Sequence, residues 1–115
     1  MKTNETLSQK QRRFGRMAAA LLNKALEMGY EYTFGDAYRD PRAHVEFGRK
    51  IGYSAGRSLH KLKLAIDLNL FKDGKYLSST EAHRPLGEWW ESQGGTWGGR
   101  FGDGNHYSLE HNGYK

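Results

Sequence analysis

The sequence predicts an α+β domain, in which a small, mainly antiparallel sheet carries helices on one side. Three observations indicate this class. Residues 8–29 have the apolar spacing of a helix, residues 64–71 alternate between aliphatic and other side chains, and an Asp73-Gly74 pair follows directly. The Asp-Gly pair predicts a hairpin turn, so the strand before it should have an antiparallel neighbour. At 115 residues, the chain fits one domain spanning 1–115, with no separate binding module.

The first helix is expected from Ser8 to Gly29. Ser8 and Gln11 have the spacing of a capping box. The apolar stripe that should pack on the core consists of Phe14, Met17, Leu21, Leu22, Ala25 and Leu26. The basic side chains of the same segment are interpreted as a solvated face, with contact to an anionic wall or membrane as the alternative; they are Lys10, Arg12, Arg13, Arg16 and Lys24.

Two elements are expected between this helix and the alternating strand. Aromatic and β-favouring residues over 30–38 predict one or two short strands. Asp40-Pro41 has the form of an N-cap followed by proline at the first helical position, which predicts a helix ending near Lys50 or Ile51. In the strand that follows, Asp67 should point away from the aliphatic face.

A further helix and a last strand are expected after the hairpin. Ser79 or Thr80 can cap a helix that extends to about Gln93, with Pro85 delaying its regular start. Trp89 and Trp90 are consecutive and cannot face one way, so at least one should be core. Residues 106–109 predict the last strand, which brings a distant histidine back to the sheet.

Composition limits the partners and the ligands. The formal net charge is +5, which favours a polyanionic partner such as nucleic acid, an anionic membrane surface or a cell-wall polymer. Because cysteine is absent, any metal must bind His, Asp or Glu. The N-terminal segment is polar, and its apolar stretch 17–22 is too short for a signal peptide or a membrane span. Synthesis in the cytoplasm without stable membrane insertion is therefore expected.

Four side chains form a candidate metal constellation. His60 and Asp67, seven residues apart, can converge on one ion from a loop end and a strand. Asp103 and His106 lie three apart on a tight turn, so that His106 can bind the metal while Asp103 acts on a bound water as general base. The alternative is that both histidines are ordinary surface or hydrogen-bonded residues and that Asp67 pairs with a lysine.

The order Ser58-x-His60-x6-Asp67 followed by Asp103-x-x-His106 resembles the M15 family of zinc peptidases, which includes D-alanyl-D-alanine carboxypeptidases and phage endolysins. The resemblance covers nearly the whole chain and is strongest to the small phage L-alanyl-D-glutamate peptidases. Further matching segments are Tyr38-Arg39, Leu64-Ala65-Ile66-Asp67-Leu68, Asp73-Gly74 and Trp97-Gly98-Gly99-Arg100-Phe101.

The resemblance implies the roles of the site residues. His60, Asp67 and His106 would bind Zn²⁺, and Asp103 would be the catalytic base. Arg39 would hold the substrate or stabilise the developing oxyanion, and Ser58 would support the metal-site loop. The implied fold is hedgehog/D-Ala-D-Ala peptidase-like, with the zinc site in an open cleft.

Two positions depart from the family pattern. Lys63 stands where glycine often follows the first histidine, and His44 stands where glutamine often follows the arginine. These departures affect the expected substrate contacts rather than the metal. The histidines His44, His83 and His111 match no family role.

The resemblance also implies a biological setting. The expected function is cleavage of the L-Ala to D-Glu bond of peptidoglycan stem peptides by a monomeric phage endolysin during host lysis. The enzyme would be made in the host cytoplasm and would need a holin to reach the wall in the periplasm. A nucleic-acid partner is not expected.

Three alternatives remain open from the sequence. The same zinc chemistry would serve a D-alanyl-D-alanine carboxypeptidase or dipeptidase. A basic nucleic-acid-binding domain would use the first helix, with the histidines incidental. A zinc-stabilised wall-binding protein would have the same fold and no turnover.

Overall fold

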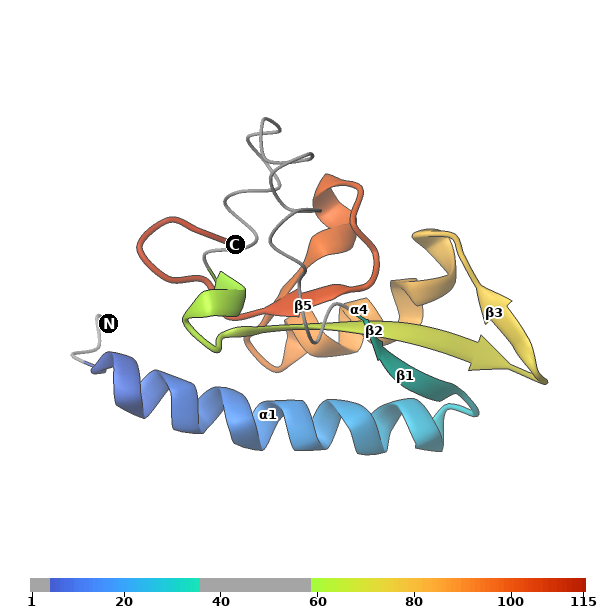
Figure 1. Ribbon diagram of the computed structural model, residues 1–115, viewed down its shortest axis with the longest axis horizontal. Helices are drawn as coiled ribbons and strands as arrows, with labels where there is room; N and C mark the ends of the chain where they lie inside the picture. The colour runs from blue at the N-terminus through green and yellow to red at the C-terminus, as the bar shows by residue number, and fades with distance from the viewer. Residues whose placement is uncertain (1–4, 36–58) are drawn as a thin grey trace.

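The computed structural model describes residues 5–35 and 59–115, and it confirms an α+β domain with an antiparallel sheet (Figure 1). The predicted helix beginning at Asp40-Pro41 lies outside the described residues. In chain order the elements are α1 (Leu7–Glu27), β1 (Glu31–Gly35), β2 (Ala65–Lys72), β3 (Lys75–Leu77), η1 (Glu81–His83), α4 (Arg84–Ser92), β4 (Thr96–Trp97), η2 (Gly98–Phe101) and β5 (His106–Ser108).

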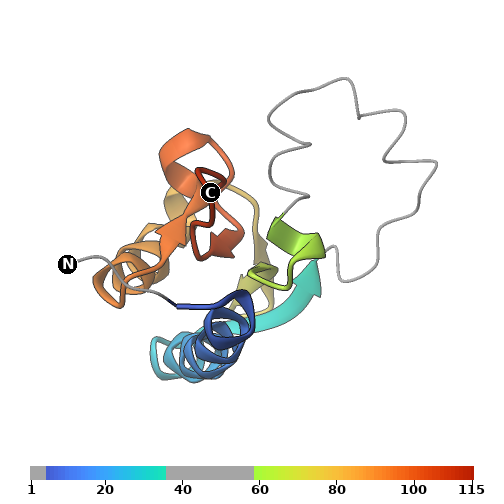
Figure 2. The ribbon, with the colours of Figure 1, turned by 90° about the vertical axis from the view of Figure 1, so that its left-hand side faces the viewer.

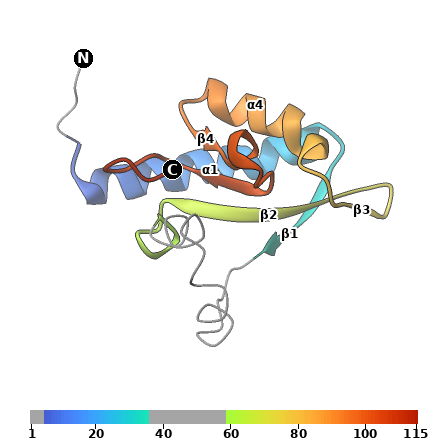
Figure 3. The same cartoon turned by 90° about the horizontal axis from the view of Figure 1, so that it is seen from above.

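Strand β2 is the centre of the sheet. One of its edges pairs with β1, while its other edge pairs first with β5 and then, further along, with β3. Strand β4 extends the sheet beyond β5. Every pairing within 5–35 and 59–115 is antiparallel, as the sequence predicts. Helices α1 and α4 lie on the same side of β2 (Figures 2 and 3), which leaves the other face of the strand for the site.

The N-cap of helix α1 lies two residues before the predicted one, and the helix begins at Leu7 instead of Ser8. Its N-cap is Thr6, whose Oγ1 accepts a hydrogen bond from the Gln9 amide at 3.1 Å, while the Gln9 side chain accepts from the Thr6 amide at 2.9 Å. The predicted box of Ser8 and Gln11 is therefore wrong, although both pairs have the same spacing. The earlier start places Leu7 on the helix, where it packs against the core.

The core lies between the two helices and the sheet. Phe14 of α1 meets Trp90 of α4 edge to face, with ring centroids 6.0 Å apart. Leu68 and Leu70 project from β2 into the same cluster and are fully buried, as the aliphatic alternation predicts. Of the two consecutive tryptophans, Trp90 is core and Trp89 is partly buried at its edge. This burial of apolar surface holds β2 and the helices together.

Two predicted local features are confirmed. Asp73 and Gly74 both have positive φ, 54° and 78°, which is the conformation of a two-residue hairpin turn between β2 and β3. The segment after Thr80 begins as the 3-10 helix η1 and becomes regular only at Arg84, with Pro85 in the first turn of α4. Proline lacks an amide hydrogen, so it is tolerated there.

Candidate metal centre

The register of two paired strands brings one carboxylate and one imidazole side chain together. Asp67 of β2 and His106 of β5 are direct partners in the antiparallel ladder, and paired side chains project on the same face. That face is opposite to Leu68, so Asp67 points away from the helices, as predicted. It is nevertheless only 5% exposed, and His106 is 2% exposed. Asp67 is therefore buried among polar side chains on this face of the sheet and is not exposed to solvent.

His60 reaches the same place from a turn. Leu59, His60 and Lys61 form a single helical turn, and Leu59 is fully buried. The Leu64 amide donates to the Leu59 carbonyl at 2.9 Å, which reverses the chain into β2. Lys63 completes the reversal with a φ of 61°, in the left-handed region that favours glycine. The departure at Lys63 therefore falls on a position where glycine would fit with less strain.

The three side chains converge on one point. His60 Nε2 lies 3.3 Å from Asp67 Oδ1, and His106 Nδ1 lies 3.4 Å from the same oxygen. One ligand atom from each of the three residues lies within 4.8 Å of the others. The imidazole rings meet edge to face at 5.5 Å between centroids. Two imidazole nitrogens and a carboxylate oxygen at these separations could hold a metal ion, so the residues fit such a group.

The orientation of His106 suits a metal ligand. Its Nε2 lies 2.9 Å from the main-chain oxygen of Lys115, and because that oxygen can only accept, Nε2 is the donor. Nδ1 is then the atom directed at Asp67 and available to a metal. A ligand histidine usually donates its second nitrogen to such an acceptor. Burial alone would lower the pKa of His106, but the hydrogen bond and charge of Asp67, the Lys115 hydrogen bond and the charge of Asp103 together raise that pKa.

Asp103 lies beside this group but outside it. The Asp103 amide donates to the Gly98 carbonyl at 2.9 Å, and the Asp103 carbonyl accepts from the His106 amide at 3.1 Å. The residue is exposed, and its carboxylate helps to raise the pKa of His106. A β-carbon on Gly98 would come within 2.3 Å of the Asp103 carbonyl oxygen, so the turn requires glycine there. The turn thus carries an acidic group next to the three converging side chains.

Trp97 supports this turn, a role that sequence reasoning did not assign. Its Nε1 donates to the Gly104 carbonyl at 2.7 Å. The guanidinium groups of Arg84 and Arg100 each lie 5.4 Å from its ring. Arg100 is tied in turn to Glu91 of α4 by two hydrogen bonds, at 2.7 and 2.8 Å. The sequence signal for this role is the tryptophan in the Trp97-Gly98-Gly99 run, because a buried indole needs a hydrogen-bond acceptor for its N–H.

The remaining predicted residues have separate outcomes. Arg39 and Ser58 lie outside the described residues, as does His44. His83 is buried, and its Nδ1 lies 2.9 Å from the Tyr107 hydroxyl, so it is a hydrogen-bonded core residue. Burial lowers the pKa of His83 to about 4. His111 is also hydrogen-bonded, to Lys10 at 3.1 Å.

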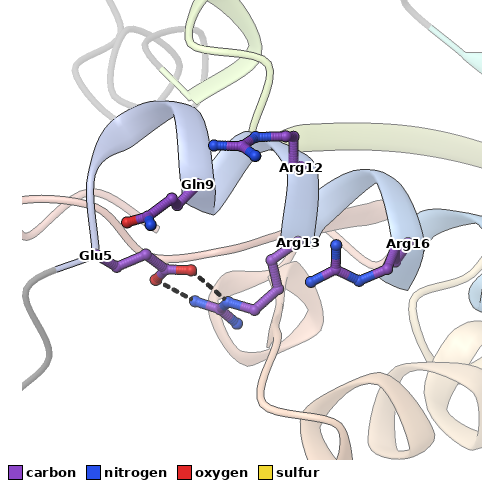
Figure 4. A pocket seen from close by; sticks show the side chains of 5 residues that line it. All are labelled: Glu5, Gln9, Arg12, Arg13 and Arg16. Atoms are coloured by element: carbon purple, nitrogen blue, oxygen red, sulfur yellow. Dashed lines mark hydrogen bonds and ion pairs between the residues drawn. The ribbon is translucent and has the colours of Figure 1, made fainter.

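The basic side chains of α1 have mixed surroundings. Arg13 forms a two-point ion pair with Glu5, with a shortest distance of 2.8 Å, beside a shallow hollow that Arg12 and Arg16 also line (Figure 4). Arg12 donates from Nε to the Ser8 carbonyl of its own helix. Lys24 lies 3.6 Å from Glu27. Some of the basic side chains that were expected to be solvated therefore form ion pairs or hydrogen bonds within the protein.

A small α+β domain in which two histidines and an aspartate converge has the construction of a metal-assisted hydrolase. The family model of the M15 D-alanyl-D-alanine carboxypeptidases matches residues 52–109, half of the chain, and the chain belongs to this family. It is therefore a hydrolase of the peptidoglycan peptidase type. The match spans Ser58, His60, Asp67, Asp103 and His106, but not Arg39. No curated protein and no solved structure matches the chain.

Among the helices of residues 5–35 and 59–115, none is both long enough and apolar enough to traverse a membrane.

Proposed function

We propose that this M15 peptidase is a zinc-dependent endopeptidase that cuts the L-Ala to D-Glu bond of peptidoglycan stem peptides, as a phage endolysin. The observation that carries the proposal is the convergence of His60, Asp67 and His106 within 4.8 Å in a member of a peptidase family. Three protein ligands leave a position open for water or substrate, which is the arrangement of catalytic rather than structural zinc sites.

The spacing of the ligand atoms supports zinc. For metal–ligand bonds of about 2.05 Å, the edge of a tetrahedron is about 3.3 Å long. The separations from Asp67 Oδ1 are 3.3 Å to His60 Nε2 and 3.4 Å to His106 Nδ1. Imidazole nitrogens favour zinc over magnesium or calcium, which prefer oxygen ligands. Zinc therefore suits the donor atoms and the two separations from Asp67, while the third separation, between the histidine nitrogens, is within 4.8 Å.

The residues of the chain divide the proposed reaction between them. When bound, zinc supplies Lewis-acid polarisation of the scissile carbonyl and lowers the pKa of water. Asp103, exposed beside His106, would take the proton of the attacking water and pass it to the leaving amine. Arg39 would stabilise the developing oxyanion as a fixed cation. Ser58 would support the turn that carries His60.

The biological setting is part of the same proposal. The protein would act as a monomer on the wall after a holin opens its way from the host cytoplasm to the periplasm. The net charge of +5 would assist contact with the anionic sacculus. One domain, 1–115, would carry the entire activity.

A second activity is favoured by the family match itself. The matching family is described as D-alanyl-D-alanine carboxypeptidase, so removal of a terminal D-Ala is the alternative reaction. The same zinc ligands and base would serve both bonds, because both are amides. Only the contacts that place the peptide would differ.

Digestion of purified Gram-negative peptidoglycan tests the proposal. The zinc-loaded protein is compared with EDTA-treated protein and with Asp103→Asn, and the soluble products are identified by mass spectrometry. We expect free stem peptides with new L-Ala carboxyl and D-Glu amino ends, from the zinc-loaded wild type alone. Release of D-Ala alone would establish the carboxypeptidase reaction instead. No metal-dependent product of either kind would overturn the enzymatic proposal on this substrate.

A further inference from the structure

A pocket of about 340 Å³ is lined by sequence neighbours of two groups at the metal centre, and the proposed reaction so far gives it no role. It is lined by Lys61, Leu62, His111, Asn112 and Tyr114. One wall, Lys61, directly follows the ligand residue His60. The other wall, Tyr114, directly precedes Lys115, whose main-chain oxygen contacts His106 at 2.9 Å. Both walls are therefore one residue away from a group of the candidate metal site.

Contacts with α1 hold the two walls in place. Gln11 donates from its side chain to the Leu62 carbonyl at 2.7 Å. Lys10 donates to the Glu110 carbonyl and to His111 Nδ1, both at 3.1 Å. His111 and Tyr114 exchange two main-chain hydrogen bonds of 2.9 and 3.0 Å. The pocket is thus built from a turn and a bridge that the same helix supports, and it does not depend on surface side chains alone.

The lining is mainly apolar and carries one cation, a combination that suits a peptide segment with a single carboxylate. Lys61 is exposed and brings an ammonium group, and the lining residues include no carboxylate. Because Lys10 can only donate, His111 Nδ1 accepts, and the ring carries its proton on Nε2 as a further donor. Leu62 and the half-exposed ring of Tyr114 add apolar surface. A volume of this size accommodates a short peptide segment.

We infer that this pocket is a substrate subsite that binds a carboxylate of the peptide close to the scissile bond, with Lys61 as its cation. The inference rests on the proposed function. In a stem peptide, D-Glu is joined onward through its γ-carboxyl group, so its free α-carboxylate stands on the carbon bonded to the leaving nitrogen. Because Lys61 directly follows the ligand residue His60, its long side chain would pair with that carboxylate in the bound peptide. The subsite thereby selects acidic stem peptides over their amidated forms.

The experiment uses two synthetic stem peptides that differ only at this carboxylate. One contains D-Glu and the other contains D-isoglutamine, in which the α-carboxylate is an amide. Wild type, Lys61→Met and the control Lys75→Met are each assayed with both peptides. Methionine keeps the aliphatic stem and removes the charge, and Lys75 is an exposed residue of the β3 hairpin. Zinc content is measured for every variant, because Lys61 adjoins His60.

We expect the wild type and Lys75→Met to prefer the D-Glu peptide by roughly 10- to 100-fold in kcat/KM, mainly through KM, as for a hydrogen bond to a charged group. Lys61→Met should retain zinc and lose this preference. Equal cleavage of both peptides by the wild type, or an unchanged preference in zinc-loaded Lys61→Met, would overturn the subsite alone. Cleavage of neither peptide by zinc-loaded wild type would instead overturn the proposed function, and the subsite with it.

Discussion

The metal centre draws its ligands from two regions that are built differently. Asp67 and His106 stand on paired strands, where the register of β2 and β5 places them opposite each other. His60 stands on a turn that the Leu59 to Leu64 hydrogen bond and the left-handed Lys63 create. The sheet side is braced by the buried Trp97. The turn side is held by the buried Leu59 and by the hydrogen bond from Gln11 to the Leu62 carbonyl, and it carries the left-handed Lys63. The comparison indicates that strand pairing sets the positions of Asp67 and His106, while the conformation of the turn sets the position of His60.

Loss of individual ligands should have the largest effect and should separate the two regions. We expect both His60→Ala and His106→Ala to lose zinc and activity. His106→Ala should lower the free energy of unfolding of the metal-free protein by about 1–3 kcal/mol, and by more than His60→Ala. His106 is buried and also loses its hydrogen bond to the Lys115 oxygen, whereas the His60 side chain is 19% exposed. Zinc content, turnover and urea unfolding in EDTA are the measurements. A larger stability loss in metal-free His60→Ala than in His106→Ala would contradict the comparison.

The next prediction tests the bracing of the sheet side. A β-carbon on Gly87 of α4 would come within 2.2 Å of the Trp97 ring, which lies between two arginines. Gly87→Ala should lower the free energy of unfolding by about 2–3 kcal/mol through overpacking.

Gly15→Ala is the matched control for this change. Gly15 lies within α1, and a β-carbon there would have nothing within 4 Å. Alanine should therefore raise stability by about 0.5–1 kcal/mol, since glycine is costly inside a helix. Urea unfolding measures both variants, and similar changes in the two would exclude the Trp97 contact as the cause.

A smaller effect should appear as a pH dependence of the sheet side. His83 contacts Tyr107 of β5, and burial lowers the pKa of His83 from 6.5 to about 4. Between these values the unfolded chain binds the extra proton, so stability is complete above pH 6.5 and falls as the pH drops towards 4. The loss should be about 2 kcal/mol by pH 5. Thermal unfolding of metal-free wild type and His83→Gln checks this. If the stability of wild type and of His83→Gln depended equally on pH between 4 and 6.5, His83 would not be the cause of the pH dependence.

The smallest effect is expected on the turn side. Lys63 has a φ of 61°, so Lys63→Gly should relieve the cost of a side chain in the left-handed region and raise stability by up to about 1 kcal/mol. Lys75→Gly, in the extended strand β3, is the control and should lower stability by about 0.5–1 kcal/mol. Chemical denaturation resolves the two signs. A loss of stability in both variants would show that Lys63 is not strained.

Local patterns were sufficient for several elements and insufficient for their boundaries. The alternation before Asp73-Gly74 correctly predicts β2 and its hairpin, because strand periodicity and turn chemistry are properties of neighbouring residues. Spacing predicts the cap of α1 at Ser8, whereas the structure has it at Thr6, because two residue pairs share one spacing and only the packing of Leu7 distinguishes them. The prediction that Asp67 points away from the core was right, but its burial needed β5 as a neighbour.

The sequence by itself determined the class of the fold, the family and the three residues that could hold a metal. The fold class follows from periodicity and turn pairs together with the resemblance to M15 peptidases, and that resemblance also gives the family and the roles of the metal-site residues. Tertiary structure alone decided which atoms meet: the register of Asp67 with His106, the nitrogen of His106 directed at Asp67, and the bracing of the turn by Trp97. The physical reason is that such contacts join residues far apart in sequence, and their distances depend on how strands, turns and helices pack together.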